Sequence, residues 1–179
     1  MFKRKEKDSR RIIEFLNKER VCDLSMIFEG EPHITPMIYV YDEENDAMFF
    51  HSSPDGTKIR ALRADGRVAF SVMRHTANHV IDTDGKPCGY GIVYESVVGY
   101  GRMTVIDALD EKIAAYDMMS AKFAPHKPES RTKTQCKKGE SPAGFEYREN
   151  ELNSSLILRL DIKVKSGKAW DGINPVCYF

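Results

Sequence analysis

The sequence predicts a small, mainly β protein: a barrel of about six short antiparallel strands with helices at its ends. Apolar and polar residues alternate in several short segments, which is the pattern of half-buried strands. Turn residues such as Gly30, Pro32 and Gly56 separate these segments at short intervals. Few segments have helical periodicity, and strands at such spacing are typical of small antiparallel barrels.

Length and composition indicate one domain over residues 1–179, with 125–150 as a loop-rich excursion. Lysine plus arginine and aspartate plus glutamate both number 27, so the formal net charge is zero. This balance gives no general attraction to nucleic acid or anionic membranes. No apolar run reaches the roughly 20 residues of a membrane span, and the basic N-terminus leads into no signal-peptide core. We therefore expect a cytoplasmic protein.

The N-terminal half is predicted to contain a helix followed by three strands. Residues 8–20 carry an apolar stripe at helical spacing, and residues 21–28 alternate in the manner of a strand. A second strand is expected over 33–41 and a third over 47–51. In the second, alternation places Ile34, Ile38 and Val40 on one face and Thr35, Met37, Tyr39 and Tyr41 on the other.

The C-terminal half is predicted to hold the remaining strands. After a short helix over 59–64, residues 67–73 alternate, and the turn-rich stretch 75–89 is expected to be a loop. A long strand follows over 90–106, where Gly99 and Gly101 share a face and allow either a bend or close approach of a ligand. A helix up to Phe123 comes next, and the clearest strand covers 156–164.

Metal chemistry is not expected. The four cysteines are scattered without a CxxC pair. His75 and His79 stand four apart, a spacing that suits a metal only on a helix, and here they flank the start of a predicted loop.

Residues 48–58, MFFHSSPDGTK, form a candidate anion site. The end of a strand, a turn at 54–56 and a helix start would together present free N–H groups, with Lys58 adding a positive charge. The alternative for Lys58 is a solvated side chain, although a cation is unfavourable at a helix N-terminus. Ser52 and Thr57 are as suited to capping the helix as to binding phosphate. His51 is either a structural strand-end histidine or a proton donor.

The order of the motifs GEPHITPMIYVYD, FFHSSPDGTK, RVAFSV, YESVVGYGR and SGKAW resembles the FMN-binding split-barrel family of pyridoxamine 5'-phosphate oxidase. The similarity is greatest to its 5-nitroimidazole antibiotic-resistance branch. It implies FMN as cofactor and a homodimer with flavin sites at the subunit interface. The second strand and SGKAWDGIN lack the arginines with which the oxidase branch grips pyridoxal phosphate, which argues against vitamin B6 oxidation.

The resemblance also implies roles for individual residues. Lys58, with Ser52 and Thr57, would bind the phosphate, and His51, the candidate catalytic residue, would lie near the flavin and its small-molecule site. Ser96 would contact the flavin ring. The second strand would also contact this ring, largely through the strand's backbone. The strand residues concerned are Thr35, Pro36, Met37, Ile38 and Tyr39. Trp170 would either cover the flavin or anchor the C-terminal segment.

The function implied is an FMN-dependent oxidoreductase that reduces nitroimidazoles or other small acceptors. The alternative is a carrier or sensor that binds flavin or haem without turnover, for which the candidate axial ligands are His75, His79, His126 and Cys136. A third hypothesis is a barrel that binds no chromophore and only dimerises or binds a protein partner.

Overall fold

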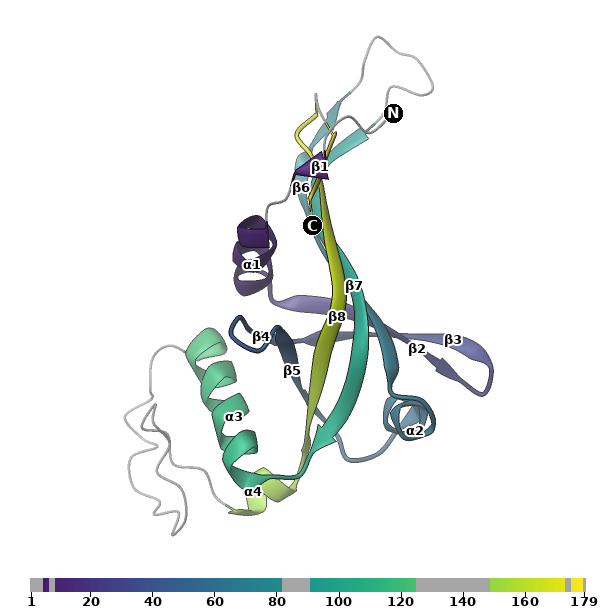
Figure 1. Cartoon of the computed structure of the whole chain (residues 1–179), viewed down its shortest axis with the longest axis vertical. Coiled ribbons are helices and arrows are strands. Elements are labelled where there is room, and N and C mark those ends of the chain that lie inside the picture. Colours follow the sequence, from purple (N-terminus) through teal and green to yellow (C-terminus); the bar gives the residue numbers. More distant parts are fainter. Residues whose placement is uncertain (1–4, 7–8, 82–90, 125–148, 173–174, 179) are drawn as a thin grey trace.

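A computed structural model of the chain describes residues 5–6, 9–81, 91–124, 149–172 and 175–178. Within them, nine strands join in one sheet and four helices flank it (Figure 1). The strands are β1 (Lys5–Glu6), β2 (Val21–Phe28), β3 (Glu31–Ile38), β4 (Val40–Asp42), β5 (Ala47–Ser52), β6 (Arg67–Ile81), β7 (Gly91–Ile106), β8 (Leu156–Trp170) and β9 (Pro175–Tyr178). The helices are α1 (Ser9–Lys18), α2 (Thr57–Ala64), α3 (Leu109–Phe123) and α4 (Glu149–Asn153).

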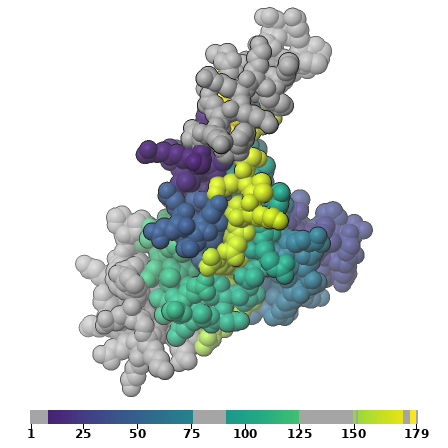
Figure 2. Space-filling view, viewed as in Figure 1, coloured from purple at the N-terminus to yellow at the C-terminus, as the bar shows by residue number. Residues whose placement is uncertain are grey.

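The sheet follows the order β1-β9-β8-β7-β6-β2-β3 and is antiparallel except for the β1–β9 pair. One edge of β8 pairs with β7 along most of its length. Its other edge is divided, because the first half pairs with β5 and the last residues pair with β9. β5 and β8 consequently lie side by side. In Figure 2, the blue surface from the part of the chain that contains β5 adjoins the yellow surface of the C-terminal strands. No ladder joins β3 to β5 among the described strands, so the sheet stays open.

Strand β5 lies between two hydrophobic cores because its side chains alternate between its faces. Met48 and Phe50 point into the large core of the barrel, which α1 and α2 also line. Ala47 and Phe49 point the other way, into a smaller core with Ala115 of α3. All four side chains are buried, which explains why this segment is apolar without interruption.

Gly99 and Gly101 allow β7 to approach its neighbours closely. A Cβ at Gly99 would lie 2.6 Å from the Phe70 ring, and one at Gly101 would lie 2.0 Å from the carbonyl oxygen of Asp161. The register with β8 shifts between Tyr100 and Gly101, as it does at a bulge that bends a strand. The bend that the two glycines suggested is therefore present.

The mainly β fold class is confirmed, and most predicted elements are found. Three details were wrong. The second predicted strand ends at Ile38, and β4 starts after Tyr39, so that Val40 is buried in the smaller core while Ile38 is exposed. The strand count is nine rather than six, partly because of this break and partly because β1 and β9 add short end strands.

The third error concerns the predicted loop at 75–89. Strand β6 continues to Ile81, because pairing with β7 extends beyond the alternating part of the sequence across a register shift after His75. Residues 82–90 lie outside the described part, as does the excursion at 125–150 except for its last two residues, which begin α4. No helix in the described ranges is both long and apolar enough to cross a membrane.

An ion-pair network ties α1 and the C-terminal strand to the sheet. The carboxylate of Glu95 on β7 accepts hydrogen bonds from Arg11 Nε (2.7 Å), Arg74 (3.0 Å) and the Tyr178 hydroxyl (2.7 Å). Burial alone would raise the pKa of Glu95, but the hydrogen bonds from Arg11 and Tyr178 and the two guanidinium charges outweigh it and lower the pKa. The side chain is only 15% exposed, so these contacts are weakly screened.

We predict that Glu95→Gln lowers the free energy of unfolding by about 2 kcal/mol at pH 7, since it removes charge-assisted bonds from a half-buried network. Because folding lowers the pKa of Glu95, its stabilisation is complete above the ordinary pKa of glutamate. It disappears as the pH falls through the folded-state pKa. Urea unfolding at pH 7 and pH 3 measures both effects.

The matched control is Glu14→Gln, which breaks the exposed Arg10–Glu14 pair and should cost under about 0.5 kcal/mol. Equal losses for the two variants, or a Glu95→Gln loss that persists in acid, would contradict this account of the network.

Candidate functional site

The end of β5 and the start of α2 form the predicted anion site. Pairing of His51 with Ile157 and of Ser52 with Leu156 fixes the end of β5 against β8. The chain then turns through Gly56, whose φ of 118° suits glycine and strains other residues. Helix α2 begins at Thr57, and Ile59, Ala61 and Leu62 anchor it in the large core.

Among the described residues, the N-terminus of α2 has no side-chain cap. The N-cap residue is Gly56, which has no side chain that could accept a hydrogen bond from the first-turn N–H groups. Ser52 Oγ instead donates to the Ser53 carbonyl (3.0 Å), and Thr57 Oγ1 accepts from Arg60 (3.4 Å). The capping alternative for the two hydroxyls is therefore not observed, and the helix N-terminus keeps N–H donors available to an anion.

Lys58 is a half-buried cation at this N-terminus. Burial lowers its pKa, and among the described residues no carboxylate pairs with it. Burial also lowers the pKa of His51, and the charge of Lys58 lowers it further. The two side chains therefore lie within electrostatic reach of each other. A bound phosphate would oppose both effects, because its negative charge stabilises a nearby ammonium or imidazolium.

Strand β3, where the predicted ring contacts lie, is the last strand of the sheet. An edge strand presents backbone N–H and C=O groups without strand partners, which fits contact through the backbone. Thr35 is half-buried, Pro36 and Ile38 are exposed, and Met37 is buried in the core. Tyr39 follows the strand.

The Tyr39 side chain is fully buried. Its hydroxyl donates to the Leu16 carbonyl at 2.8 Å, and Lys122 Nζ lies 4.4 Å from its ring centroid. This side chain joins α1, α3 and the sheet, and the backbone N–H of Tyr39 donates to the Arg20 carbonyl at 3.2 Å, so neither is open to a ligand within this chain.

Ser96 and Trp170 lie in another part of the sheet. Ser96 pairs with Lys168, and its hydroxyl donates to the Lys168 carbonyl at 3.4 Å. The Trp170 ring occupies the space beside Gly91. Along β8, Lys168 lies roughly 35 Å from Ile157, the partner of His51, at about 3.3 Å per residue. One chain thus brings together His51, Ser52, Thr57 and Lys58, but not Ser96 or Trp170 with them.

The sequence analysis missed Tyr116, which lies beside His51, and Ser155, which is bonded to Tyr116. The Tyr116 ring lies 5.9 Å from the imidazole between centroids, and the Tyr116 hydroxyl lies 2.6 Å from the hydroxyl of Ser155. No local pattern could have revealed these contacts, since they join residues 51, 116 and 155.

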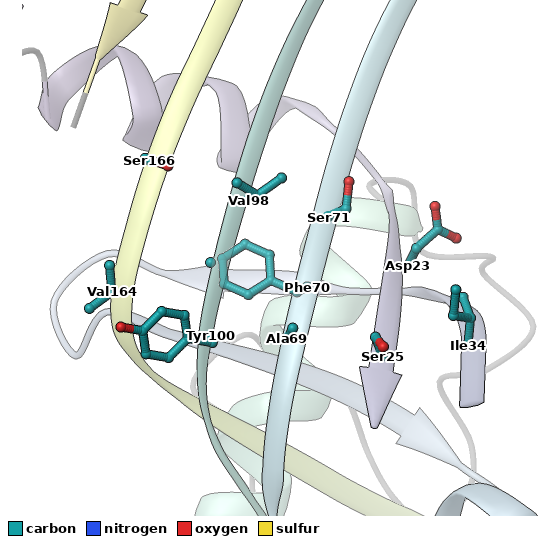
Figure 3. A pocket seen from close by; sticks show the side chains of 11 residues that line it. Asp23, Ser25, Ile34, Ala69, Phe70, Ser71, Val98, Tyr100, Val164 and Ser166 are labelled. Atoms are coloured by element: carbon teal, nitrogen blue, oxygen red, sulfur yellow. The ribbon is translucent and has the colours of Figure 1, made fainter. Parts of the chain in front are cut away.

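The outer face of the sheet carries an apolar hollow of about 390 Å³ (Figure 3). The Phe70 ring reaches it where Gly99 carries no side chain, between Val98 and Tyr100. Ile34 and Val164 lie at its ends. None of the predicted site residues lines the hollow, so it is separate from the anion site.

Large exposed hydrophobic residues continue this surface beyond the hollow. We call the eight concerned the outer apolar face: Val21, Ile27, Ile34, Ile38, Met73, Val98, Tyr100 and Val164. The outer apolar face could have been predicted from the sequence, because these strands have apolar residues on both faces rather than on one.

Solved structures with the same fold include flavin-binding proteins. A protein from Bacteroides thetaiotaomicron, provisionally assigned as a 5-nitroimidazole antibiotic resistance protein, is 22% identical, with a TM-score of 0.66 over 90% of this chain and 84% of that chain. An FAD-binding protein from Mesorhizobium loti is 21% identical, with a TM-score of 0.58 over 91% and 95%. An FAD- and haem-binding protein from Mycobacterium smegmatis is 21% identical, with a TM-score of 0.72 over 93% and 73%. At these identities the likeness establishes the fold alone.

A comparison with curated protein sequences gives no match. The sequence pattern of the family described as pyridoxamine 5'-phosphate oxidase, however, matches residues 8–169. This range contains every predicted site residue except Trp170, and it agrees with the split-barrel fold of the neighbours. The chain therefore belongs to the pyridoxamine 5'-phosphate oxidase family.

Proposed function

We propose that the protein is an FMN-dependent oxidoreductase that acts on a small acceptor, with nitroimidazoles as one candidate class. The observation that carries the proposal is the half-buried Lys58, which has no carboxylate partner among the described residues and stands at a helix N-terminus without a side-chain cap. A buried ammonium without a counter-charge is costly. A phosphate monoester fits this place in size and charge, and FMN has one.

Different residues bind the phosphate and the ring of the cofactor. Lys58 and the first N–H groups of α2 bind the phosphate, with the hydroxyls of Ser52 and Thr57 adjacent. The backbone of β3 lies beside the ring. When bound, the flavin supplies electron transfer to the acceptor, whereas the protein contributes orientation and exclusion of water.

His51 is the candidate group for handling a proton. In the flavin-free protein, burial and the charge of Lys58 lower its pKa, which favours the neutral imidazole with a proton on one ring nitrogen and an acceptor at the other. A neutral imidazole beside a cation is suited to donating a hydrogen bond to an electron-rich oxygen of the acceptor. Protonation of a reduced nitro group is chemistry of this kind.

We also propose a homodimer in which each flavin site takes residues from both chains. The separation of Ser96 and Trp170 from Lys58 within one chain supports this arrangement, because a second copy can bring its Ser96 and Trp170 to the first. The outer apolar face supports it too. Eight exposed hydrophobic side chains on adjoining strands form a larger apolar surface than monomers usually leave in water.

The second candidate function is a flavin- or haem-binding carrier or sensor. The similarity in fold to the FAD- and haem-binding protein from Mycobacterium smegmatis supports this candidate. His75 is exposed on β6. The side chains of His79, His126 and Cys136 lie outside the described residues. Haem needs no phosphate site at Lys58, so the anion site favours a flavin.

We predict that Lys58→Ala reduces FMN affinity about 10- to 100-fold, the loss expected for a charge-assisted phosphate contact. The purified wild type, mixed with FMN and desalted, should keep the flavin absorption bands, and the variant should lose them. Arg63→Ala is the control, because Arg63 is an exposed cation in the last turn of the same helix. Equal FMN retention in all three proteins would refute the site, and a Soret band in place of flavin bands would favour haem.

We predict that Val98→Asp converts the dimer into a monomer, measured by sedimentation velocity. Val98 is 49% exposed in one chain, so the isolated subunit should tolerate the change, whereas a buried interface would not tolerate the charge. Thr104→Asp places the same charge at another exposed position of β7 outside the hollow and should leave the dimer intact. A wild type that sediments as a monomer, or a Val98→Asp variant that remains dimeric, would contradict this interface.

A further inference from the structure

His51 lies at the end of the part of β5 over which α3 packs. By strand alternation it shares a face of β5 with Ala47 and Phe49, both buried in the smaller core under α3. His51 itself is exposed. Its imidazole is therefore open to a ligand on one side and touches α3 on the other.

The contact on the α3 side is the ring of Tyr116. The two ring centroids are 5.9 Å apart and the planes are inclined by 60°, within the range of favourable edge-to-face aromatic pairs. Ala115, next to Tyr116, is fully buried and fixes this part of α3 on the sheet. The tyrosine ring thus forms a rigid wall against one side of the imidazole.

Ser155 holds that wall in place. Its hydroxyl lies 2.6 Å from the Tyr116 hydroxyl, and its side chain is only 6% exposed. Ser155 directly precedes β8, whose Ile157 pairs with His51 through the backbone. The tyrosine is consequently anchored to the same strand that fixes the backbone of His51.

We propose that Tyr116 is a positioning residue for His51: held by Ser155, it fixes the imidazole beside Lys58 at the phosphate site. The function of this arrangement rests on the proposed binding of a flavin phosphate. Tyr116 does not touch the ligand in this account. It limits the orientations of the imidazole and shields it from water on one side.

The electrostatic consequence follows from the groups that face the imidazole. Among the described residues, α2 contributes the ammonium of Lys58 and α3 contributes the uncharged phenol of Tyr116, whose hydroxyl is bonded to Ser155. Burial, to which the Tyr116 ring contributes, is the larger cause of the lowered pKa of His51, and the charge of Lys58 is the smaller. Removing the ring should therefore raise the pKa of His51.

The test is an NMR titration of the His51 ring protons in the flavin-free protein, with the signal assigned by His51→Gln. We expect the pKa of His51 to rise in Tyr116→Ala and in Tyr116→Leu, which keeps apolar bulk if the alanine variant fails to fold. Tyr116→Phe, which keeps the ring, should stay closer to wild type. Tyr94→Ala removes a half-buried tyrosine on β7 and should leave the titration unchanged. An unchanged pKa of His51 in folded Tyr116→Leu would overturn the proposal, because a merely structural tyrosine would alter stability alone.

A second measurement separates this inference from the proposed function. FMN titration should show about a two- to tenfold weaker Kd for Tyr116→Leu than for wild type, as expected for one lost aromatic contact. If wild type binds no FMN while the pKa of His51 still rises in the variant, the proposed function fails and the positioning role stands. If FMN binds equally to both proteins and the pKa does not move, the positioning role fails and the proposed function stands.

Discussion

The pairing of β8 with three other strands is the constraint on which the structure depends. Its long ladder with β7 holds the sheet together, and its opposite edge is divided between β5 and β9. Because β5 joins only the first half of β8, the anion site forms at one end of the molecule. The C-terminal strand and the Glu95 network occupy the other end. This division separates Lys58 from Ser96 and Trp170 within a chain.

Gly99 and Gly101 let neighbouring groups pack closely against β7. The missing side chains allow the Phe70 ring and the backbone of β8 to approach β7. The inner face closes over the large core, while the outer face keeps an open hollow with the Phe70 ring at its base. The same two positions thus serve the packing of the subunit and the surface that we assign to a second copy.

The anion site is suited to an anion because it has a local excess of positive charge. Two other half-buried cations have partners: Arg74 lies between two carboxylates, and Lys122 donates to the carbonyl oxygens at the end of α1. Among the described residues Lys58 has no such carboxylate, and it faces the positive end of a helix dipole. A protein that keeps a charge in this position loses stability unless a ligand compensates it, which is the physical reason to expect a phosphate there.

Much of the fold could be predicted from the sequence, because strands such as β2 and β8 alternate clearly and turns separate the strands. The extension of β6 to Ile81 could not, because it depends on pairing with β7 rather than on its own pattern. The cluster of His51, Ser52, Thr57 and Lys58 was accessible because its members are close in sequence. Tyr116 and Ser155 were not, since tertiary packing alone brings Tyr116 to His51 and Ser155 to Tyr116.

The role of the buried side chain of Tyr39 was also beyond the sequence. Alternation placed Tyr39 on one face of the predicted strand with Thr35, Met37 and Tyr41. It could not show that the strand breaks there, or that the Tyr39 hydroxyl donates to the Leu16 carbonyl of α1. A one-residue interruption of a strand leaves little trace in an apolar pattern.

The most direct test of the central claim compares the affinities of the wild-type protein for FMN and for riboflavin, which differ only in the phosphate. If Lys58 and the N-terminus of α2 hold that phosphate, FMN should bind at least tenfold more tightly, and added salt should reduce the difference. Equal affinity for the two flavins would contradict the account, because the anion site would then contribute nothing to binding.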